Sequence, residues 1–288
     1  MAEQFISADQ WDKIRWIMRS CGLQAQRSAN EQFQVFEKGF EDYVTNVDRQ
    51  LDAQLASEFA ALFPNDGVIT EENPQSRQLF QQDYQRLWCI DPVDGTDDFI
   101  QGRAHYSVMV GLLQGDRPRA GWIYAPEFDQ LYYGGENVGL FQAEGDRPPE
   151  PLIPNQPAPP SADFCPMIIG DKDRKRYGDA IAQRIPGASF YSIGSFGLKV
   201  MEVINGRAGL YAYFNGRVKL WDTVGPLALA LAAGLECCDL EGNPLSFTAD
   251  ALDLESLAHR QTVIIGWSPY VAALRSHLQS AVEAIDQA

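Results

Sequence analysis

Two helical patterns of apolar residues open the chain. The first covers about residues 8–27 and follows a possible N-cap at Ser7 or Asp9. The second follows Asp48 and ends before the turn sequence Pro-Asn-Asp-Gly at 64–67. In both, the apolar side chains recur three or four residues apart: Trp11, Ile14, Met18 and Cys21 in the first; Leu51, Leu55, Phe59 and Leu62 in the second. The pattern predicts two amphipathic helices that each bury one face.

From residue 87 the pattern changes to short apolar runs separated by Gly, Pro and Asp, which is typical of strands. These runs are LWCI (87–90), YSVMVGLL (106–113), AGWIYAP (120–126) and QLYYGG (130–135). We expect them to form one sheet.

A proline-rich segment, RPPEPLIPNQPAPP at 147–160, holds seven of the seventeen prolines of the chain. Neither a helix interior nor a central strand tolerates proline, so we place a domain boundary here. Beyond it, short apolar strands alternate with helical stretches at about 171–185, 195–205, 222–233 and 268–285, which indicates an α/β half. The expected division is an N-terminal α+β domain over 1–150 and a C-terminal α/β domain over 151–288.

The overall charge limits the partners. With 288 residues, a net charge of -16 and a pI of about 4.5, the protein repels nucleic acid and anionic membranes. The N-terminus lacks the pattern of a signal peptide and no apolar run reaches the length of a membrane span, so we expect a cytoplasmic protein. The five cysteines form no CxxC pair and read as reduced, buried thiols, which argues against a zinc site.

Acidic residues gather where apolar strands end. The segment DPVDGTDDF at 91–99 directly follows LWCI, and Glu71 and Glu72 directly follow the strand-like VIT. Asp222 is placed at the N-cap of the helix at 222–233, where the helix dipole favours a carboxylate. Two carboxylates about 4 Å apart repel by roughly 4 kcal/mol at an effective dielectric constant near 20, so a cation must offset the charge. Hard oxygen ligands of this kind are the ligands that Mg²⁺ prefers.

These segments, in this order, resemble motifs of the lithium-sensitive, magnesium-dependent phosphomonoesterase superfamily that includes inositol monophosphatase. DPVDGT at 91–96 is similar to the family signature D-P-[ILV]-D-G-T, and TEE at 70–72 to its paired-glutamate motif. LWDTVG at 220–225 is similar to its W-D-x-[AG] motif, and VTNVD at 44–48 to a further element that ends in an aspartate. The resemblance runs through most of the chain and implies a layered αβαβα sandwich of the inositol monophosphatase and sugar phosphatase type.

The resemblance also implies a site. The metal ligands would be Glu71, Asp91, the Val93 carbonyl, Asp94 and Asp222. They would hold two or three Mg²⁺ ions, and Li⁺ would inhibit. The catalytic residues would be Asp48, Glu71 and Thr96, of which Asp48 and Thr96 would orient and help to deprotonate the attacking water. The substrate would contact Gly95, Thr96, Ser195, Lys199 and Arg217.

Several segments favour one branch of the family, the bacterial 3'(2'),5'-bisphosphate nucleotidases. Asp98 stands where inositol phosphatases usually have Asn, and Phe214 stands where they carry a Glu that contacts the inositol ring. TEENP at 70–74 and YSIGSFGLK at 191–199 are also similar to nucleotidase segments. Two features depart from them, because GDKDRKR at 170–176 replaces an S-R-S-H-like segment and Asp97 replaces a common Lys.

The function expected from these residues is hydrolysis of the 3'-phosphate of adenosine 3',5'-bisphosphate, which releases AMP. An inositol or sugar monophosphatase with the same metals is the first alternative. A metal-binding regulatory protein without catalysis is the second. For the enzyme we expect a small phosphorylated substrate, and for the chain a monomer or homodimer.

Overall fold

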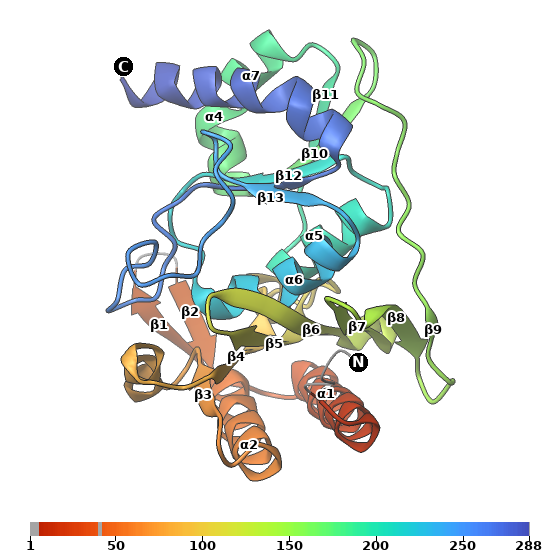
Figure 1. The fold of residues 1–288 in the computed structure, drawn as a ribbon, viewed down its shortest axis with the longest axis vertical. Coiled ribbons are helices and arrows are strands. Elements are labelled where there is room, and N and C mark those ends of the chain that lie inside the picture. The colour runs from red at the N-terminus through yellow and green to blue at the C-terminus, as the bar shows by residue number, and fades with distance from the viewer. Residues whose placement is uncertain (1–5, 40–41, 288) are drawn as a thin grey trace.

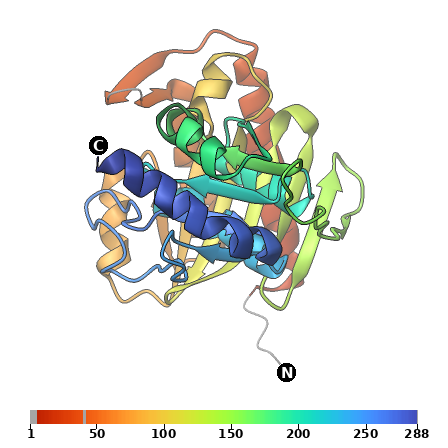
Figure 2. The same ribbon diagram turned by 90° about the horizontal axis from the view of Figure 1, so that it is seen from above.

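A computed structural model describes residues 6–39 and 42–287, and it consists of five layers (Figure 1). Helices α4 and α7 form one outer layer over a five-stranded sheet, and helices α1 and α2 form the other over a seven-stranded sheet. Helices α5 and α6 lie between the two sheets. The view from above shows α7 running across the five-stranded sheet beside α4 (Figure 2). The αβαβα sandwich expected from the resemblance is therefore confirmed.

The helices agree closely with the periodic patterns in the sequence. Their bounds are α1 Ala8–Ala29, α2 Asn46–Leu62, α3 Thr96–Ile100, α4 Asp171–Arg184, α5 Phe196–Ile204, α6 Leu220–Ala232 and α7 Ser268–Asp286. Two 3₁₀ helices, η1 Pro74–Gln81 and η2 Pro126–Phe128, complete the set in the part of the chain that the structure describes.

Two predicted helix starts are wrong by a few residues. Helix α2 begins before Asp48, because Thr45 is its N-cap and Asp48 closes a capping box from the third helical position. Helix α6 begins at Leu220 with Lys219 as N-cap, so Asp222 also lies at the third position instead of at the cap. In both cases the aspartate side chain accepts a hydrogen bond from the N-cap backbone N–H, as it would in any capping box.

The seven-stranded sheet has the order β3-β4-β5-β6-β7-β8-β9 and the five-stranded sheet the order β11-β10-β12-β14-β13. The strands of the first are β3 Gly67–Thr70, β4 Arg86–Asp94, β5 Ser107–Gln114, β6 Arg117–Ala125, β7 Gln130–Gly135, β8 Gly139–Glu144 and β9 Glu150–Pro151. Those of the second are β10 Cys165–Ile169, β11 Ala188–Tyr191, β12 Leu210–Tyr213, β13 Glu236–Cys238 and β14 Val263–Gly266. A separate hairpin pairs β1 Val35–Gly39 with β2 Asp42–Thr45.

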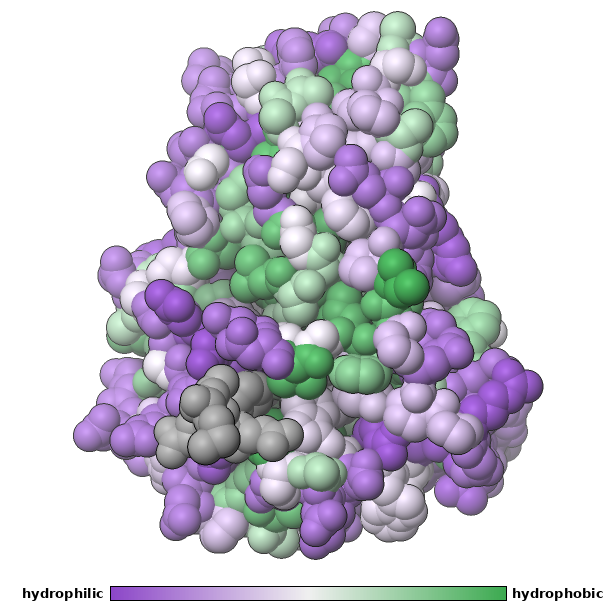
Figure 3. All heavy atoms as spheres, turned by 45° about the vertical axis from the view of Figure 1, so that its right-hand side comes forward, coloured by the Kyte–Doolittle hydropathy of each residue, from purple (hydrophilic) through white to green (hydrophobic). Residues whose placement is uncertain are grey.

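Two hydrophobic cores hold the layers together. One lies between the outer helices α1 and α2 and the seven-stranded sheet, and it includes Trp11, Trp88 and Trp122. The other is continuous from the inner face of that sheet through α5 and α6 to the five-stranded sheet and α7. The two halves of the chain thus share a core, and their division into domains at 150/151 stays a prediction. On the face shown in Figure 3, hydrophobic surface gathers at mid-height with hydrophilic residues above and below it.

Three glycines bring α6 into direct contact with the seven-stranded sheet. A Cβ atom at Gly111 of β5 would lie 2.3 Å from the Gly225 nitrogen, and one at Gly121 of β6 would lie 2.1 Å from the Gly225 oxygen. Only residues without a side chain allow this approach of helix backbone to strand backbone. The contact sets the height of the N-terminal turn of α6, which carries Asp222, over the sheet.

Candidate active site

Glu71 and Asp91 become neighbours because β3 and β4 run parallel. Thr70 is paired with Ile90, and the Glu71 N–H donates a hydrogen bond of 3.1 Å to the Ile90 carbonyl. The residues that follow this pair are therefore adjacent at the same end of the sheet. The Asp91 side chain is buried, and its Oδ1 accepts a hydrogen bond of 3.0 Å from the Val93 N–H.

A bulge and a glycine turn the chain sharply after Asp91. The register of β4 against β5 shifts between Asp91 and Asp94, and Gly95 follows with a φ of 91°. A Cβ at Gly95 would lie 2.9 Å from the Ser195 nitrogen and 3.1 Å from the His105 oxygen. Glycine is thus required here both by conformation and by space. Gly95 is also the N-cap of α3, so Thr96 is the first helical residue.

Asp94 joins the two halves of the chain. Its carboxylate accepts hydrogen bonds from the Ser195 hydroxyl, from the Phe196 N–H at 3.0 Å and from the Gly197 N–H at 2.9 Å. It therefore satisfies backbone donors that the first turn of α5 would otherwise leave without partners. A carboxylate can accept about four hydrogen bonds, so one lone pair of Asp94 is left for a cation.

Asp48 and Thr96 form a hydrogen-bonded pair across two elements. The Thr96 hydroxyl lies 3.2 Å from Asp48 Oδ1 and 3.0 Å from the Val93 carbonyl oxygen. The other oxygen of Asp48 accepts hydrogen bonds from the backbone N–H and the hydroxyl of Thr45. Burial raises the pKa of Asp48, which makes this carboxylate a stronger base than an exposed aspartate.

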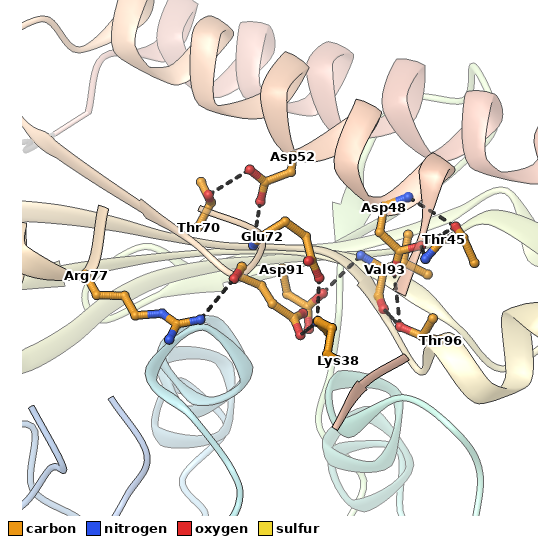
Figure 4. Close-up of polar contacts among 11 residues, drawn as sticks. Lys38, Thr45, Asp48, Asp52, Thr70, Glu72, Arg77, Asp91, Val93 and Thr96 are labelled. Carbon is orange, nitrogen blue, oxygen red and sulfur yellow. Dashed lines mark hydrogen bonds and ion pairs between the residues drawn. The ribbon is translucent and has the colours of Figure 1, made fainter. Parts of the chain in front are cut away.

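Lys38 reaches from β1 to the paired glutamates. Its Nζ lies 2.9 Å from Glu71 Oε1 and 2.7 Å from Glu72 Oε1. Asp52 supports the same turn, because it accepts hydrogen bonds from the Thr70 hydroxyl at 2.9 Å and the Glu72 N–H at 3.1 Å. Figure 4 shows the contacts of Asp52 on one side of Asp91, the Asp48–Thr96 pair on the other, and Lys38 between them.

Asp222 enters the site from α6 in the adjacent layer. Its Oδ2 accepts a hydrogen bond of 2.6 Å from the Lys219 N–H. The neighbouring Trp221 is buried, and the guanidinium of Arg77 lies over its ring at 5.2 Å. Arg77 also donates a hydrogen bond of 3.4 Å to the Glu71 carbonyl, so it links the main chain after β3 to the residue that precedes Asp222.

The electrostatics of this acidic group indicate a place for a cation. Burial, then Glu71 and Asp94, raise the pKa of Asp222 to about 7. Burial also raises the pKa of Asp91 well above its usual range, and the charges of Glu71, Asp94 and Asp222 raise it further. Buried carboxylates that repel one another need compensating positive charge, and their oxygens suit a hard divalent ion.

The carboxylate side chains do not have the arrangement of a complete metal-binding site in this structure. Within the described residues, no three Asp, Glu, His or Cys side chains are grouped so that they could hold a metal ion directly. Several of their oxygens instead face protein donors: Lys38, the start of α5 and the Lys219 N–H. The donor set suits Mg²⁺, but the assignment of Glu71, Asp91, Val93, Asp94 and Asp222 as its ligands stays a prediction.

Comparison with known proteins decides the family, because the Inositol monophosphatase family matches residues 9–276. The chain belongs to the inositol monophosphatase family. The 3'(2'),5'-bisphosphate nucleotidase CysQ of Shigella flexneri is 31% identical over 214 residues, which are 74% of this chain and 83% of that protein. A fructose-1,6-bisphosphatase/inositol-1-monophosphatase of Aquifex aeolicus is 29% identical over 202 residues, which are 69% of this chain and 72% of that protein.

A solved structure of an IMPase from Thermotoga maritima has the same fold. Its TM-score is 0.76 at 20% identity, and the match covers 96% of this chain and 99% of that one. The chain is thus a phosphoric monoester hydrolase of the inositol monophosphatase family that acts on small phosphorylated substrates. This argues against the alternative of a non-catalytic regulatory protein. Among the described residues, no helix has the length and apolarity needed to cross a bilayer.

The predicted substrate contacts of this family member lie at different depths. The Ser195 hydroxyl is fully buried, contacts Asp94 and Ser107, and accepts the Leu198 N–H, so in this structure it supports Asp94 and caps α5. Lys199 is also buried, and its Nζ donates to the Gly194 carbonyl at 3.0 Å. Arg217 is exposed in the loop before α6. All three assignments stay predictions, as do those of Gly95 and Thr96.

Several residues around the site were missed in the sequence. Lys38, Asp52 and Arg77 carry no periodic or motif signal, and their partners lie six to 34 positions away in the chain. A capping box is different, since Thr45 and Asp48 have the spacing of a Ser/Thr residue and an acidic residue at the third helical position. That spacing could have placed the start of α2 correctly.

Proposed function

We propose that this protein is a Mg²⁺-dependent phosphatase that hydrolyses the 3'-phosphate of adenosine 3',5'-bisphosphate and releases AMP. The observation that carries the metal dependence is the group of carboxylates from β3, β4 and α6, which the fold brings together in a buried setting. The substrate is supported by the name of the CysQ relative and by Phe214, which stands where an inositol phosphatase would carry a Glu.

Glu71, Asp91, Asp94, Asp222 and the Val93 carbonyl would hold two or three Mg²⁺ ions. When bound, the ions supply positive charge for the phosphate oxygens and acidify an attacking water. Li⁺ is expected to inhibit, as the family resemblance implies.

The chain's own residues orient the water and accept its proton. The Thr96 hydroxyl donates to Asp48, so its free lone pair can accept a hydrogen bond from the water. Asp48 then takes up the proton through Thr96, and the raised pKa of its carboxyl favours this transfer. The backbone of Thr96 is held in place because it follows the Gly95 N-cap and is the first residue of α3.

Two basic side chains on the C-terminal half would bind the rest of the substrate. Burial lowers the pKa of Lys199, and the charges of Asp94 and Asp98 oppose that lowering, so its ammonium group lies within electrostatic reach of the acidic group. Arg217 lies in the loop that leads to Asp222, near Tyr213. In this proposal it neutralises the second phosphate of the substrate.

The test is phosphate release from adenosine 3',5'-bisphosphate and from inositol 1-phosphate, with Mg²⁺ and with EDTA. We expect Mg²⁺-dependent release with a preference of about tenfold or more for the nucleotide, which corresponds to about 1.4 kcal/mol. A preference for inositol phosphate would instead support the second candidate, an inositol monophosphatase, which the name of the Aquifex aeolicus relative favours. Release that EDTA does not reduce would contradict the metal dependence.

A further inference from the structure

A buried carboxylate lies outside the acidic group described above. Asp173, in the first turn of α4, is only 1% exposed. Buried charged side chains are rare unless they are paired or hydrogen-bonded. Asp173 Oδ2 accepts a hydrogen bond of 2.8 Å from the Phe214 N–H. Burial raises the pKa of this carboxyl, and the neighbouring Phe214 and Asn215 oppose the rise.

The partners of Asp173 belong to the loop at 214–219, which joins β12 to α6. This loop carries Arg217 and ends three residues before Asp222. One turn along α4 from Asp173, the Tyr177 ring packs edge-on against Phe214 at 5.6 Å. Helix α4 therefore holds the first residues of the loop by a charged hydrogen-bond acceptor and by an aromatic contact.

The far end of the loop is fixed independently. The Val218 carbonyl accepts a hydrogen bond of 2.9 Å from the His259 N–H, and Lys219 forms a bridge with Ala258. Between these two anchors the chain turns at Gly216, with a φ of 69°, and Arg217 is exposed there. The Arg217 N–H donates to Asn215 Oδ1 at 3.2 Å, so the backbone of Arg217 is tied to the residue that directly follows Phe214.

We propose that Asp173 is a positioning residue for substrate specificity, which holds the 214–217 segment so that Arg217 reaches the second phosphate of the substrate. The inference rests on the proposed function, because it assigns Arg217 to that phosphate. Without the carboxylate, the Phe214 N–H loses its acceptor, and the start of the turn that presents Arg217 keeps only the aromatic contact with Tyr177 from helix α4.

The kinetic test compares Asp173→Ala with Asp173→Asn and Arg217→Ala. The substrates are adenosine 3',5'-bisphosphate and p-nitrophenyl phosphate, which has no second phosphate. For Asp173→Ala we expect the KM of the bisphosphate to rise about tenfold, with a smaller change in kcat. The fall in kcat/KM should be about five times larger for the bisphosphate than for p-nitrophenyl phosphate. Asp173→Asn keeps one acceptor oxygen and should recover part of the loss. Asp179→Ala, an exposed aspartate on the same helix, is the matched control.

The double variant separates positioning from general loss of structure. If Asp173 acts through Arg217, adding Asp173→Ala to Arg217→Ala should change the KM of the bisphosphate by less than about twofold. Additive effects, or equal losses on the two substrates, would overturn the inference.

A second measurement does not depend on the identity of the substrate. Hydrogen exchange of the Phe214 amide should be at least about tenfold faster in Asp173→Ala than in the wild type and unchanged in Asp179→Ala. Unchanged exchange at Phe214 would overturn the positioning role. If exchange accelerates but the wild type does not prefer the bisphosphate, the proposed substrate has failed while the control of the loop by Asp173 stands.

Discussion

Replacing Asp222 by Asn is expected to stabilise the metal-free protein above neutral pH while it abolishes catalysis. Burial and the charges of Glu71 and Asp94 raise the pKa of the Asp222 carboxyl from 3.8 to about 7. An asparagine at this position keeps an acceptor oxygen for the Lys219 N–H, which now lies 2.6 Å from Asp222 Oδ2. The substitution therefore removes a repelled charge and retains the capping hydrogen bond.

The size and the sign of the effect follow from the pKa. A rise from 3.8 to about 7, at 1.36 kcal/mol for each pH unit, corresponds to about 4 kcal/mol of unfavourable free energy for the ionised side chain. Since the folded pKa lies above the unfolded one, this penalty is absent below about pH 4, grows between pH 4 and 7 and is complete above about pH 7. The wild type should lose stability as pH rises through this window, and Asp222→Asn should lose about 2–4 kcal/mol less.

The assay is urea unfolding in EDTA at pH 5 and pH 8. Asp179→Asn, which removes an exposed aspartate of α4, controls for the change in net charge. A gain for Asp222→Asn that is equal at both pH values, or a loss of stability at pH 8, would refute the electrostatic reasoning. Phosphate release measured on the same samples should fall by several orders of magnitude if Asp222 is a metal ligand.

Three further substitutions test other parts of the structure. Asp94→Asn should lose about 2–3 kcal/mol of stability as well as activity, because the new NH₂ group cannot accept the hydrogen bond of the α5 donor that it would face. A melting temperature equal to that of the wild type would contradict the hydrogen-bonding role of Asp94. Gly95→Ala should destabilise the protein by about 1–3 kcal/mol more than Gly102→Ala. Both glycines have a positive φ, but of the two only Gly95 lacks space for a Cβ. Equal melting temperatures of the two variants would contradict the steric argument. Burial lowers the pKa of His259 to about 4. The wild type should therefore lose about 3 kcal/mol of unfolding free energy as the pH falls from 6.5 to 4. Thermal melts of His259→Gln over the same pH range should lack that loss.

The sequence predicted secondary structure best where one face of an element is buried in the core. The period of Trp11, Ile14, Met18 and Cys21 predicted α1 because the helix buries one face against the sheet. The hairpin of β1 and β2 was missed, since Val35–Gly39 is exposed along its whole length and shows no alternation. The strand β8 Gly139–Glu144 was missed for a related reason, because most of it is only half-buried or exposed.

The candidate site was predictable in its acidic residues and not in their partners. Glu71, Asp91 and Asp94 follow strand-like runs, so the parallel pairing of β3 and β4 places them at one edge. The contacts of Lys38 with Glu71 and of Asp173 with Phe214 join residues 33 and 41 positions apart. Such pairs depend on how the layers of the fold are stacked, and patterns within a short stretch of sequence do not predict contacts between distant residues.

The backbone contact at Gly111, Gly121 and Gly225 has a consequence for how this enzyme can vary. At this contact the main chain of Gly225 in α6 lies against the main chains of Gly111 and Gly121, and Val224 Cγ1 also lies beside Gly111. The approach of the helix that carries Asp222 to the sheet is therefore set largely by main-chain atoms. A side chain added at Gly111 or Gly121 would have no room beside Gly225 and would push the helix away from the sheet. These three glycines therefore limit the substitutions that the enzyme can accept far from the carboxylates themselves, because they set the distance at which Asp222 faces β3 and β4.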